Sequence, residues 1–239
     1  MRSIKLFCLP YAGGSAMMYL QLKFFFKGKS IQVCPVEIAG RGSRITEPLY
    51  SNIHEAVEDL YESIKKQINE GESFALLGYS MGALLAYEIA KRIKEDKIKG
   101  LEHIFMVSKE SPDVYEDEYE QNLYELPDDI FIKAIGELGG TPREILECEE
   151  AMNFFVPILR ADYKIVETYE PEPKAIDLGC NITAIAGRED KFTVKYLERW
   201  KRFTSKDFKM FIMDGGHFFI NEHMSELADI INNTLKENR

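Results

Sequence analysis

The stretch Phe74–Gly82, which reads Phe-Ala-Leu-Leu-Gly-Tyr-Ser-Met-Gly, decides the fold. Its first five residues form a short apolar run typical of a buried strand, and a helical pattern begins at Ser80–Met81 and continues through Ile89. The spacing G-x-S-x-G between them is typical of a sharp strand-to-helix turn that carries an exposed serine. Glycine suits positions 78 and 82 because such a turn brings backbone against backbone. A serine in an ordinary tight turn is the alternative.

Short apolar runs recur along the chain and alternate with helical patterns, which is typical of a mostly parallel sheet flanked by helices. The predicted strands are Ile4–Leu9, Ile31–Glu37, Phe74–Gly78, His103–Val107, Ile182–Ala186 and Phe208–Met213. Helical spacing is clear from Val57 to Ile68 and again near the C-terminus, where Asn221 is the expected N-cap. We therefore predict an α/β fold.

One segment, approximately residues 111–177, interrupts this alternation because it contains no convincing strand. It holds an acidic run from Asp113 to Glu120, interpreted as a solvated surface, and helical patterns around Ile130–Leu138 and Phe154–Tyr169. A long helical insertion between two sheet strands is typical of a lid over a binding site, although a helical excursion without a role is the alternative. We expect a single domain over residues 1–239 with an inserted helical lid.

Composition and charge exclude several classes of partner. The 239 residues carry a formal net charge of −10, and a field of that sign repels phosphate backbones and anionic lipids. Nucleic acids and membranes are therefore not expected as partners. The four cysteines show no C-x-x-C spacing, and the longest apolar stretch is too short to span a membrane. We expect a cytoplasmic protein without a disulfide framework.

A serine becomes a strong nucleophile only when a neighbouring base takes its proton, so the sequence must supply a histidine. His217 is the candidate because it follows the predicted strand Phe208–Met213 and the pair Gly215-Gly216, at the C-terminal end of a strand. The other histidines, at positions 54, 103 and 223, lie in helical stretches or at the start of a strand and are expected to be structural.

The imidazole needs an acid that fixes its tautomer and stabilises the imidazolium. Asp190 follows the predicted strand Ile182–Ala186, again at a C-terminal strand end, and Glu189 is the nearest alternative. Asp177 would lie at the opposite edge of the sheet, and Asp214 is expected to belong to the turn before the histidine. The order serine, acid, histidine is that of the α/β-hydrolase arrangement.

Acyl transfer also requires N–H donors for the developing oxyanion. The amide of Met81, directly after the serine, is one predicted donor. The second is expected from the loop after the first strand, where paired glycines permit close approach; Ala12 is preferred and Tyr11 is the alternative. No metal-ligand motif, phosphate-binding loop or dinucleotide fingerprint is present, so no metal or cofactor is expected.

With these residues the sequence resembles a type II thioesterase of the kind that accompanies nonribosomal peptide and polyketide synthetases. The resemblance covers almost the whole chain: Leu9–Ser15, Gly40–Gly42, Gly78–Ala83, Leu126–Asp128, Leu138–Pro142, Leu159–Asp162, Gly187 with Asp190, and Gly215–Phe218. There are departures. The family often has histidine in place of Tyr11 and Tyr79, proline in place of Ala39, and a more basic stretch at Lys109–Pro112.

The resemblance implies hydrolysis of aberrant or stalled thioesters on the phosphopantetheine arm of acyl or peptidyl carrier domains, through an acyl-serine intermediate. The phosphopantetheine would belong to the substrate, and no cofactor of the enzyme itself is implied. Two alternatives stay open. One is a carboxylesterase or lipase-like hydrolase with the same three residues, and the other is a hydrolase-fold binding protein without catalysis.

Docking of an acidic carrier domain onto an acidic enzyme requires local positive charge, because like charges slow the encounter. We expect basic residues near the mouth of the lid to supply it: Lys109, Lys133, Arg143, Arg160 and Lys164.

Overall fold

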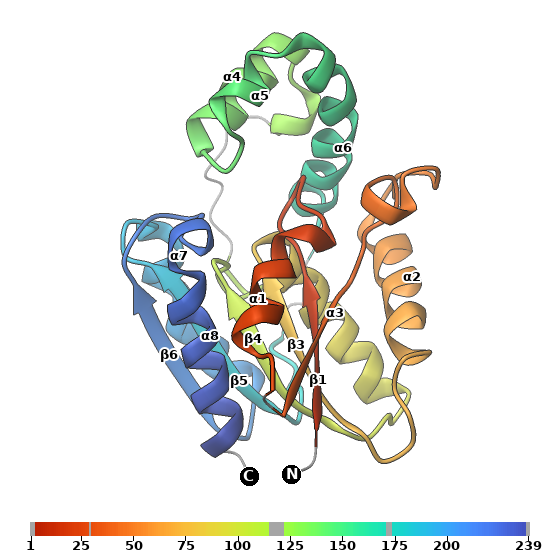
Figure 1. Ribbon diagram of the computed structural model, residues 1–239, viewed down its shortest axis with the longest axis vertical. Coiled ribbons are helices and arrows are strands. Elements are labelled where there is room, and N and C mark those ends of the chain that lie inside the picture. Colours follow the sequence, from red (N-terminus) through yellow and green to blue (C-terminus); the bar gives the residue numbers. More distant parts are fainter. Residues whose placement is uncertain (1–2, 29, 115–121, 171–173, 238–239) are drawn as a thin grey trace.

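The computed structural model describes residues 3–28, 30–114, 122–170 and 174–237. At its centre lies a parallel sheet with the strand order β2-β1-β3-β4-β5-β6 (Figure 1). The strands are β1 (Ile4–Leu9), β2 (Ile31–Pro35), β3 (Ser73–Tyr79), β4 (Leu101–Val107), β5 (Asn181–Gly187) and β6 (Phe208–Met213). Because every strand runs in the same direction, all C-terminal strand ends meet at one edge, where open α/β sheets bind ligands.

The predicted strands are confirmed, with small differences at their ends. β2 stops at Pro35 instead of Glu37, since proline supplies no N–H to the ladder and is tolerated here only because β2 is an edge strand. β3, β4 and β5 each begin one or two residues earlier than the apolar runs suggested.

Helices cover both faces of the sheet and bury alternate strand residues. On one face α2 (Ile53–Lys65), α3 (Met81–Glu95) and the 3-10 helix η4 (Leu197–Phe203) pack against strand residues such as Phe7 and Leu76. On the other face the 3-10 helix η1 (Ala16–Tyr19), α1 (Leu20–Phe25) and α8 (Ile220–Glu237) cover residues such as Leu6 and Leu77. The period of two along each strand therefore supplies two apolar cores.

The helix ends differ from the expectations in two places. α2 ends at Lys65, so Ile68 lies beyond it, and Asn52 caps its start by accepting a hydrogen bond from the Glu55 amide at 3.0 Å. The prediction that Asn221 caps the last helix is wrong, because α8 begins at Ile220. The Asn221 amide already donates to the Phe218 carbonyl at 3.2 Å and so belongs to the first turn.

Between β4 and β5 the chain forms a helical cap, defined here as residues 122–170, which stands above the C-terminal edge of the sheet (Figure 1). It contains a 3-10 helix η3 (Leu123–Glu125), α4 (Asp128–Leu138), α5 (Arg143–Leu146) and α6 (Glu149–Glu167). The sequence patterns anticipated α4 and α6 and missed the two short elements. Side chains of η3, α4 and α6 form a separate apolar cluster that includes Phe131, Ile135 and Val156.

The long helix α6 connects this cap to the body of the molecule. Its N-terminal half contributes Met152, Val156 and Leu159 to the cap cluster, whereas Ile165 packs into the core beneath α3. The helix continues through Pro157. The helix α6 therefore belongs both to the cap and to the body of the molecule.

The acidic run predicted as a solvated surface is only partly described, because residues 116–120 lie outside the described residues. The interpretation is wrong for Asp113, whose side chain is 9% exposed and pairs with Arg199 and Arg202. Two guanidinium groups offset the cost of burying this carboxylate. Within the described ranges, no helix is long and apolar enough to cross a membrane.

Candidate active site

Ser80 lies on the turn between β3 and α3, in a backbone conformation that non-glycine residues rarely adopt (φ 51°, ψ −114°). The flanking glycines make the turn possible. A Cβ on Gly78 would lie 2.2 Å from the Gly82 carbonyl oxygen, and one on Gly82 would lie 2.1 Å from the Leu9 carbonyl oxygen. The helix begins at Met81, as the sequence predicts, and the strained turn presents the serine at the C-terminal edge of the sheet.

His217 lies between Ser80 and Asp190 and bonds to both. Its Nε2 is 3.0 Å from the Ser80 Oγ, and its Nδ1 is 2.7 Å from Asp190 Oδ2. The three residues follow β3, β5 and β6, so parallel strands far apart in sequence deliver them to one place. This geometry suits proton transfer from the hydroxyl to the ring and a carboxylate that orients the ring.

Asp190 is held in the charged form. Burial opposes its ionisation, but hydrogen bonds from His217 and from the Thr193 amide outweigh that cost and lower the pKa of the carboxyl below its ordinary value. An ionised Asp190 can stabilise an imidazolium at His217.

The alternative acids lie elsewhere. Glu189 is exposed and only its amide contacts the histidine loop, through the Gly215 carbonyl at 3.0 Å. Asp214 pairs with Arg188 at the surface, and Asp177 binds Ser205 and the Gly179 amide. The structure therefore brings Asp190, and none of the three rivals, to the imidazole.

Two further residues hold the histidine loop, and the sequence analysis missed both. The Tyr79 hydroxyl donates to the His217 carbonyl oxygen at 2.6 Å, and the Ser108 hydroxyl donates to the same oxygen at 2.9 Å. Burial raises the pKa of Tyr79, so its hydroxyl keeps the donated proton at neutral pH. Ser108 directly follows β4, so its place at the C-terminal sheet edge is the signal that could have found it.

The two predicted oxyanion donors come from different elements. Met81 is the first residue of α3, and Ala12 lies on the loop after β1, whose turn is closed by the Gly14 amide on the Tyr11 carbonyl at 2.9 Å. Among the hydrogen bonds of the described residues, neither the Met81 nor the Ala12 amide donates to a protein acceptor. Both amides are therefore available to a ligand, and their role stays a prediction.

A buried ion pair lies behind this loop. Arg41, which follows β2, and Asp162 of α6 form two parallel hydrogen bonds of 2.5 and 2.7 Å. The Gly13 amide donates to Asp162 at 2.7 Å, and the Arg41 guanidinium donates to the Gly14 carbonyl at 3.2 Å. The sequence analysis noted these residues only as parts of motifs and assigned no role to them.

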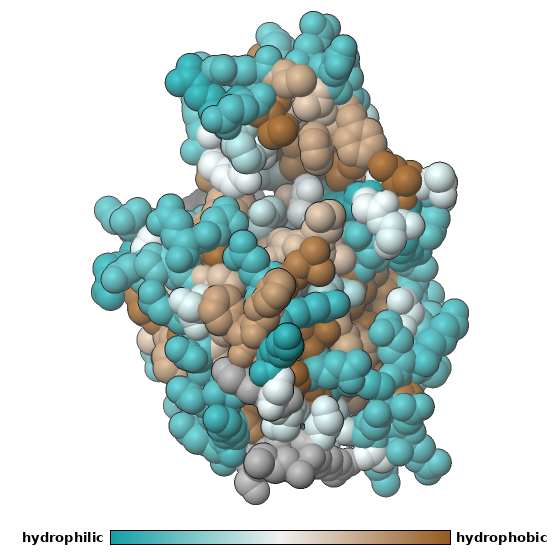
Figure 2. Space-filling view, in the orientation of Figure 1, coloured by the Kyte–Doolittle hydropathy of each residue, from teal (hydrophilic) through white to brown (hydrophobic). Residues whose placement is uncertain are grey.

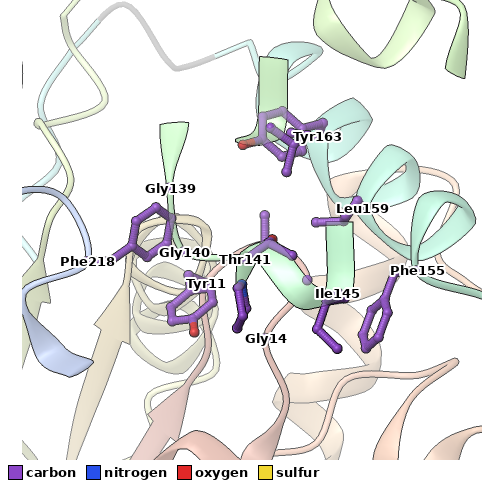
Figure 3. A pocket seen from close by; sticks show the side chains of 14 residues that line it. Tyr11, Gly14, Gly139, Gly140, Thr141, Ile145, Phe155, Leu159, Tyr163 and Phe218 are labelled. Carbon is purple, nitrogen blue, oxygen red and sulfur yellow. The ribbon is translucent and has the colours of Figure 1, made fainter. Parts of the chain in front are cut away.

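A cavity of about 160 Å³ opens between the loop after β1 and the cap. In Figure 3, Tyr11 and Phe218 lie on one side of it, Gly140 and Thr141 beside them, and Leu159 on the wall formed by α6. The lining is mostly apolar: Tyr11, Ala12, Gly13, Gly14, Ile135, Gly139, Gly140, Thr141, Pro142, Ile145, Phe155, Leu159, Tyr163 and Phe218. Neither Ser80 nor His217 belongs to the lining, but the ring of Phe218, which does, lies 4.9 Å from the His217 ring and so connects the cavity to the imidazole. An acyl chain is the kind of group that such a cavity accepts.

The described residues contain no group of three His, Cys, Asp or Glu side chains able to hold a metal ion. The four cysteines are free, and burial raises the pKa of the Cys8 thiol well above its ordinary value, which disfavours the reactive thiolate.

Comparisons with known proteins identify the family of the chain. Residues 4–235 match the thioesterase domain family. The chain is 35% identical over 242 residues to a protein of Brevibacillus parabrevis named linear gramicidin dehydrogenase LgrE, covering 98% of this chain and 88% of that protein. The present sequence has no G-x-G-x-x-G loop of the kind that dehydrogenases use for a dinucleotide.

Two solved structures are similar over nearly their full length. ClbQ from the colibactin NRPS/PKS pathway has a TM-score of 0.92 and 33% identity, with 99% of this chain and 98% of that chain covered. The type II thioesterase BorB from the borrelidin biosynthetic cluster has a TM-score of 0.83 and 29% identity, with 99% and 93% covered. The chain belongs to the thioesterase family and is a thioester hydrolase with the α/β-hydrolase fold.

Proposed function

We propose that this chain is a type II thioesterase that removes aberrant or stalled acyl groups from the phosphopantetheine arm of carrier domains in nonribosomal peptide or polyketide synthesis. The observation that carries the proposal is the hydrogen-bonded series Ser80–His217–Asp190 beside an apolar cavity, in a chain of the thioesterase family. The similarity to ClbQ and BorB, which are described with such pathways, supports the biosynthetic setting.

The residues can perform hydrolysis in two steps. In the first, Ser80 Oγ attacks the thioester carbonyl as His217 Nε2 takes its proton, and the amides of Met81 and Ala12 stabilise the oxyanion. The C–S bond then breaks, and the pantetheine sulfur leaves as a thiolate that takes the proton from His217, so an acyl-serine and a neutral imidazole remain. A thiol with a pKa near ~8.5 needs little assistance as a leaving group. In the second step His217 activates water, which releases the acid and restores the serine.

The substrate brings the phosphopantetheine arm, so we propose that the enzyme itself uses no cofactor. The volume of about 160 Å³ is small compared with ligand cavities of roughly 300–1,000 Å³, which favours a short acyl group over a long chain.

Docking of the carrier domain was expected to use five basic residues, and the structure distinguishes among them. Arg160 is occupied inside the cap, where it donates to the Leu126 carbonyl at 2.8 Å and to Asp128 at 2.5 Å. Lys109 pairs with Glu110, and Arg143 with Glu147. Lys133 and Lys164 are exposed, and no ion pair of either is described. We propose these two lysines as the stronger candidates for contact with an acidic carrier.

Apolar side chains also gather on the face over α1, as Figure 2 shows. The exposed large side chains of η1 and α1 include Met17, Leu20 and Phe24, and η1 begins directly after the loop that follows β1, residues 10–15, which we call the oxyanion loop. This surface is therefore close in sequence to the loop that carries Ala12, which a substrate tethered to a carrier domain would have to reach.

The direct test is turnover against a panel of acylated carrier domains, the matching acyl-CoA thioesters and p-nitrophenyl esters. We expect a clear preference for acyl-carrier thioesters, and a loss of about a thousandfold or more in Ser80→Ala. A strong preference for simple oxyesters would instead identify a carboxylesterase. Absence of turnover, with Ser80 left unlabelled by a fluorophosphonate in the folded protein, would support a non-catalytic binding protein.

A further inference from the structure

The ion pair between Arg41 and Asp162 is almost completely buried, with side chains that are 5% and 1% exposed. Its two hydrogen bonds are parallel, so the planar guanidinium faces the carboxylate in the two-pronged geometry that fixes orientation as well as distance. Lysine could not reproduce this arrangement, because a single ammonium lacks the rigid fork.

The same two side chains bind the oxyanion loop at two different peptide groups, Ala12–Gly13 and Gly14–Ser15. Asp162 Oδ2 accepts from the Gly13 amide at 2.7 Å, and the Arg41 guanidinium donates to the Gly14 carbonyl at 3.2 Å. Both glycines directly follow Ala12, the predicted oxyanion donor. The position of the Ala12 amide therefore depends on a carboxylate carried by α6.

Packing adds a second attachment between the loop and the same helix. A Cβ on Gly13 would lie 2.5 Å from Leu159 Cδ2, so the side chain of Leu159 rests directly on the glycine. Leu159 precedes Asp162 by about one helical turn and also lines the acyl cavity. Leu159, which forms part of the cavity wall, and Asp162, which binds the loop, thus lie on the same turn of α6.

Stability alone does not account for a buried ion pair of this kind. The cost of removing both charges from water commonly equals or exceeds their attraction, and apolar replacements are often neutral or stabilising. Orientation is a better account, because displacing a reacting group by about 1 Å can cost on the order of 10² in rate.

We propose that Arg41 and Asp162 are positioning residues that hold the oxyanion loop in its productive place and couple it to α6. This inference rests on the proposed function, since it assigns the Ala12 amide to the oxyanion. It makes the turn of α6 around Asp162 a fixed wall of the site.

The test uses three variants of the full chain: Asp162→Asn, Arg41→Lys, and the double substitution Arg41→Met with Asp162→Leu. The double variant removes both charges, so it avoids a buried unpaired ion and is expected to unfold within a few degrees of the wild type. Glu237→Gln is the matched control, because it removes one partner of an exposed ion pair with Lys209.

Two readouts separate positioning from folding. The first is kcat and KM for an acyl-pantetheine; we expect kcat to fall about 10- to 100-fold in the double variant, with KM changed by less than about threefold. The second is the rate of labelling of Ser80 by an alkyl fluorophosphonate, whose phosphoryl oxygen takes the oxyanion position; we expect a parallel fall. Arg41→Lys should lower both kcat and the labelling rate at least about tenfold, and Glu237→Gln should change neither.

Full labelling and turnover in a well-folded double variant would overturn the proposal, as would full activity in Arg41→Lys. If the double variant does not fold, Arg41→Lys and Asp162→Asn decide by the same two readouts. The labelling readout needs no thioester. A wild-type protein that labels at Ser80 but hydrolyses no thioester would defeat the proposed function and leave the positioning role testable.

Discussion

The Tyr79 hydroxyl lies 2.6 Å from the carbonyl oxygen of His217, so the residue that precedes Ser80 also holds the backbone of His217. The tyrosine is buried, and its ring lies nearly perpendicular to the imidazole, with centroids 6.4 Å apart. The position of the general base is therefore determined partly by the strand that carries the serine.

Replacing Tyr79 with Phe keeps the ring and removes this hydrogen bond. A net contribution of about 1 kcal/mol predicts a fall in kcat of about 3- to 10-fold for an acyl-pantetheine, because Ser108 still holds the same carbonyl. Tyr61→Phe is the control, since it removes a hydroxyl bonded to Asp96 at a distance from the site. A kcat for Tyr79→Phe equal to that of the control would show that the bond does not position the base.

Because backbone atoms pack closely around the turn at Ser80, adding a single methyl group at Gly82 should destabilise the fold severely. In Gly82→Ala the new Cβ would meet the Leu9 carbonyl oxygen at 2.1 Å, a backbone atom that cannot move without disturbing the oxyanion loop. We expect a loss of about 3 kcal/mol or more in the free energy of unfolding, measured by urea denaturation. Gly136→Ala is the comparison, because there the new Cβ meets only the end of the Leu146 side chain at 3.1 Å, and alanine favours the helix. Equal stability of the two variants would contradict this account.

The sheet and the three reacting side chains were predictable for one physical reason. Parallel strands buried on both faces produce continuous apolar runs, and the residues after those runs must lie at the same edge of the sheet. Ser80, Asp190 and His217 all follow such runs. The sequence could not exclude Glu189, because a shift of one residue in a turn exchanges the two acids. The structure distinguishes them, since Asp190 bonds to His217 and also caps α7 (Lys191–Tyr196) by accepting from the Thr193 amide.

The cap residues that line the cavity should determine which acyl chains the enzyme prefers. Ile145 of α5 lines the cavity, so Ile145→Trp should fill part of its volume and lower turnover of a hexanoyl thioester at least about tenfold relative to an acetyl thioester. Ile130→Trp, at an exposed position of α4 outside the cavity, should leave the ratio unchanged. An unchanged hexanoyl-to-acetyl ratio in Ile145→Trp would place the acyl chain elsewhere.

The exposed lysines of the cap predict a difference between tethered and free substrates. The double variant Lys133→Glu with Lys164→Glu should raise KM for an acyl-carrier about 3- to 10-fold at low salt and leave KM for the acyl-CoA nearly unchanged. Lys236→Glu, near the end of α8, makes the same kind of charge change away from the cap. Added salt should reduce the difference, since it screens surface charges. Equal effects on both substrates would remove the support for docking at these lysines.

The burial of His103 predicts that the fold becomes less stable in acid. It is buried, bonds to Thr183 at 2.8 Å, and burial lowers its pKa to about 3. Between pH 6.5 and 3 the unfolded chain binds a proton at this histidine that the folded chain does not. Stability therefore falls as the pH falls through this window, with a slope of up to about 1.4 kcal/mol per pH unit, and the histidine has no effect above it.

The measurement is the free energy of unfolding as a function of pH for the wild type and His103→Gln. The variant should show a flatter acid limb, whereas His223→Gln, at a half-buried position where a hydrogen bond to Glu226 raises the histidine pKa, should not. Identical slopes in the wild type and His103→Gln would assign the acid sensitivity to other groups.

Other features of the site were beyond reach of the sequence because they depend on packing between distant segments. Arg41 and Asp162 are 121 positions apart and lie in segments whose periodicity says nothing of their meeting. α5 spans only four residues, too few to show a helical repeat. The capping position of Asn221 was assigned wrongly, because cap-forming residue types also occur inside first turns.

The separate apolar cluster of the cap has an evolutionary consequence. Because Phe131, Ile135 and Val156 stabilise one another without the sheet, mutations can accumulate in the roof of the cavity without eroding the scaffold that carries the reacting groups. Within α6 this tolerance ends at Asp162, which must keep its contacts with Arg41 and the Gly13 amide. Of the cap residues that line the cavity, those on the N-terminal side of Asp162 are therefore the ones that can change with the least disturbance of the sheet.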